Sequence, residues 1–127
     1  MNDEKVPVTG LHSEIGEWRS NVELVRSEIT TFQKQLAEIA SKNTHVEVMK
    51  GVEHFQNQFI RQLEVSDELR QALRKADHRL AAREMSDRGT ETVLVEDNEP
   101  LRDRAVTYTK LFVELKDEYH SFLEKWM

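Results

Sequence analysis

Hydrophobic residues recur at alternating steps of four and three along this chain. The first stretch to do so comprises Leu11, Ile15, Trp18, Val22, Val25, Ile29, Phe32, Leu36 and Ile39. The last stretch comprises Leu101, Ala105, Tyr108, Phe112, Leu115, Tyr119, Phe122 and Trp126. Because an α-helix turns once per 3.6 residues, such a repeat stays on one face only when the helix winds left-handedly around a partner. The pattern therefore predicts helices with coiled-coil packing.

A third stretch lies between these two and keeps the same spacing. Its members are Val48, Val52, Phe55, Phe59, Gln62, Ser66, Leu69, Leu73, Ala76 and Leu80. We predict helices over about 10–41, 45–86 and 99–127, which bury three apolar faces against one another. The expected fold is an all-α, antiparallel three-helix bundle that forms a single domain over residues 1–127. Its overall design resembles the spectrin-type three-helix unit.

The segments between the predicted helices contain residues that typically start or stop a helix. Residues 1–9 are polar and contain Pro7, so we expect a frayed terminus in which Thr9 caps the first helix. Asn43 is a candidate left-handed stop, and the segment 44–47 reads as a capping box. This short connection favours an antiparallel hairpin. Residues 86–100 are expected to form a long interhelical loop.

The short hairpin also predicts which residues meet. We expect the Phe32–Leu36 stretch to face Phe55 and Phe59, with Phe122 and Trp126 at the same end. In this register Phe59 is a central core residue, so its replacement by alanine should destabilise the fold by about 3–5 kcal/mol. The residues expected around Trp18 are Leu69 and the Leu115–Tyr119 stretch.

Two consecutive positions of the middle hydrophobic seam are polar, Gln62 and Ser66. The predicted register places Tyr119 close to them, where its hydroxyl can supply a hydrogen bond. A buried polar layer of Gln62, Ser66 and Tyr119 typically fixes helix register at some cost in stability. The alternative is that this layer lines a small ligand cavity.

Composition limits the classes of function. The chain has 127 residues, of which 33% are charged, and it has no cysteine, which excludes disulfides and cysteine-ligated zinc. Its formal net charge of −6 repels nucleic acid phosphates and anionic membrane surfaces. We see neither a signal-like apolar stretch in residues 1–10 nor a run of about 20 apolar residues, so we expect a cytoplasmic protein that does not enter a membrane.

The histidines lack the spacing of a metal centre. Carboxylate-bridged di-iron bundles use Glu-x-x-His on their helices, and the nearest match here is the single pair Asp117 and His120. His12 and His78 are expected at one end of the bundle. The chain also lacks a nucleophile motif and a glycine-rich phosphate loop. We therefore expect no enzyme activity, no catalytic residues, no bound metal and no cofactor.

Basic residues form a stripe on the middle helix: Arg70, Arg74, Lys75, Arg79, Arg83 and Arg88. Carboxylates interrupt this stripe, and no aromatic residue is available for base stacking. We therefore interpret it as a solvated face with ion pairs, and we do not expect nucleic acid binding.

Two features remain for contact with a protein partner. Val106, Val113 and His120 lie at seven-residue steps on one outer line of the third helix, and Val93, Leu94 and Val95 lie between acidic residues. We hypothesise a non-enzymatic interaction or scaffolding module with an unidentified protein partner. The alternatives are a metal- or ligand-binding bundle completed by dimerisation and, more weakly, a nucleic-acid accessory protein. Pairing of two third helices in a homodimer would also bury Val106 and Val113.

Overall fold

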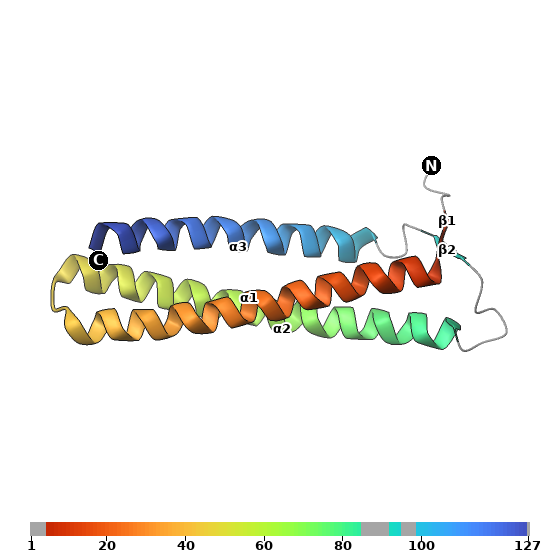
Figure 1. Ribbon diagram of the computed structural model, residues 1–127, viewed down its shortest axis with the longest axis horizontal. Coiled ribbons are helices and arrows are strands. Elements are labelled where there is room, and N and C mark those ends of the chain that lie inside the picture. Colours follow the sequence, from red (N-terminus) through yellow and green to blue (C-terminus); the bar gives the residue numbers. More distant parts are fainter. Residues whose placement is uncertain (1–4, 85–91, 95–98, 127) are drawn as a thin grey trace.

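The computed structural model contains three long helices that run side by side (Figure 1). They are α1 (Val8–Lys42), α2 (Val46–Glu84) and α3 (Glu99–Trp126). The structure describes residues 5–84, 92–94 and 99–126. The prediction of an all-α three-helix fold is confirmed, with helix bounds close to the expected ones. None of the helices described in these ranges is long and apolar enough to cross a membrane.

A two-stranded antiparallel sheet joins the start of the chain to the connection between α2 and α3. Strand β1 (Lys5–Pro7) pairs with strand β2 (Thr92–Leu94), and Val6 is aligned with Val93. The expectation that residues 5–7 are frayed is therefore wrong. Because β1 leads directly into α1, Thr9 lies inside the first helical turn and does not precede it.

The turn between α1 and α2 closes with side-chain hydrogen bonds that differ from the predicted ones. The Asn43 Nδ2 amide donates to the Ile39 carbonyl at 2.9 Å, and among the described residues only negative φ angles occur outside glycine. The left-handed stop at Asn43 is therefore wrong. The Glu47 backbone N–H donates to His45 Nδ1 at 3.2 Å, so His45 caps α2 in place of the predicted capping box.

The predicted hydrophobic seams form the core of the molecule. Every seam position of α2 is buried, and those of α1 and α3 are buried apart from Trp18, Leu101 and Trp126, which are partly exposed. Burial of apolar surface is the main favourable contribution to folding, at about 25 cal/mol per Å². The 4-3 spacing thus identified the inward face of all three helices.

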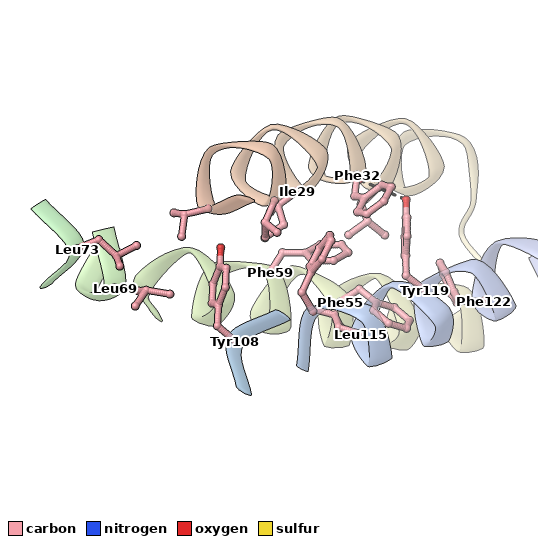
Figure 2. Packing of buried hydrophobic residues seen from close by; sticks show 14 of the residues in the cluster. Ile29, Phe32, Phe55, Phe59, Leu69, Leu73, Tyr108, Leu115, Tyr119 and Phe122 are labelled. Atoms are coloured by element: carbon pink, nitrogen blue, oxygen red, sulfur yellow. Dashed lines mark hydrogen bonds between the residues drawn. The ribbon is translucent and has the colours of Figure 1, made fainter. Parts of the chain in front are cut away.

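An aromatic cluster fills one half of the core (Figure 2). The Phe59 ring is fully buried and lies 5.6 Å from the ring of Phe32 and 5.2 Å from that of Tyr119, measured between centroids. The Phe55 and Phe122 rings are 5.3 Å apart. These contacts confirm the predicted register between α1 and α2, and they place the C-terminal half of α3 at the same end.

The position predicted for Trp18 is wrong with respect to α3. The Arg102 guanidinium carbon lies 5.9 Å from the centre of the Trp18 ring. Helices α1 and α3 run parallel (Figure 1). Further along both helices, Asn21 of α1 donates a hydrogen bond to Thr109 of α3. Trp18 is therefore level with the first turns of α3, far from the Leu115–Tyr119 stretch. Its predicted contact with Leu69 stays a prediction.

Candidate interaction surface

A ladder of polar contacts connects α1 to α3 at seven-residue steps. Its pairs are Glu14 with Arg102, Asn21 with Thr109, and Glu28 with Lys116. The Arg102 guanidinium donates twice to Glu14, at 2.7 and 3.2 Å, and this hydrogen bonding raises the pKa of Arg102 against the opposing effect of burial. The ladder fixes the parallel alignment of the two helices. Because its charged groups are partly exposed, each pair contributes at most about 1 kcal/mol.

The predicted line on the third helix lies beside this ladder. Val106 is 61% exposed and Val113 is 49% exposed. Each of them follows a buried position by one residue, which places them on the solvent side of the ladder. His120 continues the same line and is also exposed, and its ring centre lies 5.9 Å from that of Phe32.

Helix α1 contributes a third apolar side chain on the other side of the ladder. Leu24 is 59% exposed, and its position, one residue before the buried Val25, lies on the solvent side of the ladder residues Asn21 and Glu28. All three ladder pairs have the same sequence separation, and applying it to Leu24 on α1 places Leu24 about level with Val113 on α3. We call the surface formed by Leu24, Val106, Val113 and the ladder between them the α1–α3 face. The off-seam position of Leu24 is evident from the sequence, but Leu24 was not among the residues predicted for the partner surface, because the sequence alone does not align α1 with α3.

The second predicted surface, at Val93, Leu94 and Val95, is only partly described. Val93 and Leu94 belong to strand β2, where they are aligned with Val6 and Lys5. Their side chains and the whole of Val95 lie outside the described part of the structure. A docking role for this segment stays a prediction.

The buried polar layer exists, but Tyr119 is not its third member. Gln62 is 8% exposed and Ser66 is fully buried. The Ser66 hydroxyl lies 2.5 Å from the hydroxyl of Tyr108. The prediction failed because the spacing does not give the axial position of α3, and Tyr119 is level with Phe59.

Tyr119 instead connects α3 to α1. Its hydroxyl donates to the Phe32 carbonyl at 3.3 Å and to Gln35 Oε1 at 2.9 Å, and Figure 2 shows this hydroxyl directed towards α1. Burial raises the pKa of Tyr119 to about 12. Burial also raises the pKa of Tyr108, against the opposing hydrogen bond from Ser66. Both phenols therefore act as neutral structural groups near neutral pH.

Ion pairs between α1 and α2 involve the start of the predicted basic stripe. Arg70 Nε lies 3.0 Å from Glu23 Oε2. Asp77 accepts from Arg19 at 2.9 Å and lies 2.6 Å from His12 Nδ1. The groove beside these residues has a volume of about 630 Å³. Arg70 has the ion-paired character that we predicted for the stripe, whereas Arg74, Lys75 and Arg79 form no ion pair within the described part of the structure. The side chains of residues 83 and 88 lie outside that part.

A shallow apolar groove that the sequence did not predict lies among the described residues of the structure. It has a volume of about 280 Å³ between α2 and α3, and its lining includes Val65, Leu69, Tyr108 and Leu111. Gln62, the buried amide nearest in sequence, is not part of its lining. Tyr108, the hydrogen-bond partner of Ser66, does line the groove. The alternative of a ligand cavity at the polar layer stays a prediction.

Among the described residues, no group of three or more histidine, aspartate or glutamate side chains is arranged to hold a metal ion. A metal-binding bundle would thus need ligands from outside these residues or from a second chain. In comparisons with known proteins, no family model, curated protein or solved structure matches this chain.

Proposed function

We propose that this chain is a cytoplasmic, non-enzymatic module for protein–protein interaction or scaffolding, built on coiled-coil packing of three helices. In this proposal the α1–α3 face is the surface that contacts the partner. The supporting observation is the exposure of Val106 and Val113 at 61% and 49%, at a seven-residue spacing and beside an exposed Leu24. Recognition between helices commonly uses apolar anchors with this spacing.

The use of the remaining hydrophobic residues supports the same proposal. The seam positions pack against one another inside the molecule, so they are not available to a partner. Outside the core, the exposed Ile60 on α2 and the exposed Leu111 on α3, which lines the groove between α2 and α3, lie away from the polar ladder. Isolated surface hydrophobic residues are normal, whereas a group on adjacent helices is more typical of a contact surface.

The proposal is tested by affinity capture from the native cell followed by quantitative mass spectrometry. The bait proteins are the unmodified chain, the double variant Val106→Ser/Val113→Ser, and Ile60→Ser as a matched control. Ile60 is 52% exposed on α2 and is therefore as accessible as the two valines. We expect a partner that the unmodified chain and the control retain and that the double variant loses. Capture of the same proteins by all three baits would contradict the proposal.

A further inference from the structure

We infer that the α1–α3 face binds a basic amphipathic helix. This inference rests on the proposed function and specifies the chemistry of the partner. It is drawn from two properties of the face, exposed apolar side chains on both sides of the ladder at a spacing that suits a helix, and predominantly acidic residues outside them. The spacing of the apolar side chains permits several helical partners, and the acidic residues favour a basic one.

The exposed apolar side chains of the face have the spacing of a helix contact. Val106 and Val113 are two helical turns apart, about 10 Å along the α3 axis. Leu24 lies across the ladder and is level with Val113, so the three side chains border a shallow strip over α1 and α3. Apolar residues at i, i+3 or i+4, and i+7 on an incoming helix would cover this strip.

The border of this strip is acidic on both helices. The charges of the ladder neutralise one another, because Arg102 pairs with Glu14 and Lys116 pairs with Glu28. Outside the ladder, the exposed charged residues on the solvent side are predominantly carboxylates. They are Glu17, Lys34 and Glu38 on α1, and Glu99, Asp103, Lys110, Asp117 and Glu124 on α3.

This charge favours a basic partner over a second copy of the chain. Two copies packed through the same face would oppose these carboxylates with carboxylates, and like charges across an interface are unfavourable. The net charge of −6 on the whole chain adds to this repulsion. A helix with apolar residues in its centre and lysine or arginine on its flanks would match both the strip and its border.

The experiment uses a synthetic probe, because no natural partner is identified. The probe is a helical peptide of about 20 residues with leucine at heptad spacing and lysine on its flanks. Its twin has glutamate in place of each lysine. Fluorescence anisotropy measures binding to the full chain, and amide chemical shifts locate the bound peptide. We expect the lysine peptide to bind at least about tenfold more tightly than its twin, with amide shifts at Leu24, Val106 and Val113.

Variants distinguish this site from general attraction to an acidic protein. Val106→Ser/Val113→Ser should weaken binding about tenfold, whereas Ile60→Ser should leave it unchanged. Asp103→Asn/Asp117→Asn should weaken binding and reduce its dependence on NaCl between about 50 and 300 mM. Circular dichroism of each variant verifies that the three helices are intact. Equal affinity of the two serine variants, or amide shifts confined to the outer side of α2, would overturn the inference.

Failure of the inference can be separated from failure of the proposed function. If neither peptide binds, yet sedimentation shows a dimer whose amide shifts map to Val106 and Val113, the basic-helix inference is overturned and an interaction surface on this face still stands. If the peptide binds as expected and capture from cells is insensitive to both valines, the chemistry of the face is supported and its cellular role is not.

Discussion

Gly51 of α2 lies directly beneath the ring of Phe122 from α3. A β-carbon built on Gly51 would lie 2.8 Å from Phe122 Cδ1 and closer still to Cε1. Phe122 is only 9% exposed and packs against Phe55, so its ring has little room to move. The glycine therefore allows α3 to approach α2 closely at this end of the bundle.

We predict that Gly51→Ala destabilises the protein, although alanine is the better helix former. Overpacking costs about 1–3 kcal/mol, which exceeds the gain of up to about 1 kcal/mol in helix propensity. Urea unfolding followed by circular dichroism measures the difference. Gly16→Ala is the matched control, because no atom lies within 4 Å of a β-carbon built there, and it should raise stability by about 0.5–1 kcal/mol. An equal gain in both variants would show that the Phe122 ring moves aside without cost.

Phe59→Ala should lower the free energy of unfolding by about 3–5 kcal/mol. The Phe59 ring is fully buried and contacts the rings of Phe32, Phe55 and Tyr119 from all three helices. Its neighbour Ile60 is 52% exposed, so Ile60→Ala should cost much less. Thermal and urea midpoints compare the two variants. Similar losses at both positions would contradict the assignment of Phe59 to the centre of the core.

Periodicity predicted the inward face of each helix because a regular spacing is a local property of the chain. It did not predict the axial position of α3, and for this reason Tyr119 was expected where Tyr108 lies. The turn of three residues between Lys42 and Val46 fixes α1 against α2. The connection from Glu84 to Glu99 is too long to impose a comparable constraint on α3.

The remaining differences have similar physical origins. The pairing of Val6 with Val93 joins short segments that are far apart in the sequence, so it has no periodic pattern to reveal it. His45 caps α2 through a ring nitrogen, a role for which Thr44 is the more usual residue type. The exposure of Val106 and Val113 was predictable from their phase, but the position of Leu24 relative to them required the aligned ladder.

Gln62→Met should stabilise the protein by about 1–2 kcal/mol. Gln62 Nε2 is buried and has no hydrogen-bond partner among the described residues, so the amide bears a desolvation cost without compensation. Methionine has nearly the same length and shape but no polar group. Urea unfolding measures the change, and Gln58→Met, at an exposed position one turn earlier on α2, is the control. A loss of stability in Gln62→Met would mean that the amide makes a favourable contact.

Removing one member of the Ser66–Tyr108 pair should cost more than removing both. Their hydroxyls are 2.5 Å apart, and both residues are buried. Ser66→Ala leaves the buried Tyr108 phenol without its partner, which should cost about 1–3 kcal/mol. Tyr108→Phe leaves the buried Ser66 hydroxyl without its partner and should also be destabilising. The double variant should recover part of the loss. A double-mutant cycle from urea midpoints measures the coupling energy, and simple additivity of the two losses would contradict a direct hydrogen bond.

The stability of the protein should fall as the pH rises above about 10, because both of its tyrosines are buried. Burial raises the pKa of Tyr119 to about 12. A tyrosine in the unfolded chain titrates near pH 10, so the unfolded state loses its proton first. The contribution of Tyr119 is therefore fully present below about pH 10 and is lost progressively as the pH approaches 12.

The control for this pH dependence is Tyr119→Phe, which keeps the buried ring and removes the titrating hydroxyl. The other titrating groups are the same in both proteins, so the difference between their urea midpoints isolates the effect of Tyr119. We expect the variant to start from a lower stability, because the hydrogen bonds to Phe32 and Gln35 are lost, and to decline less steeply with pH. Phenolate absorbance gives an independent measure. If both tyrosines of the folded protein ionise near pH 10, the packing assigned to Tyr119 is wrong.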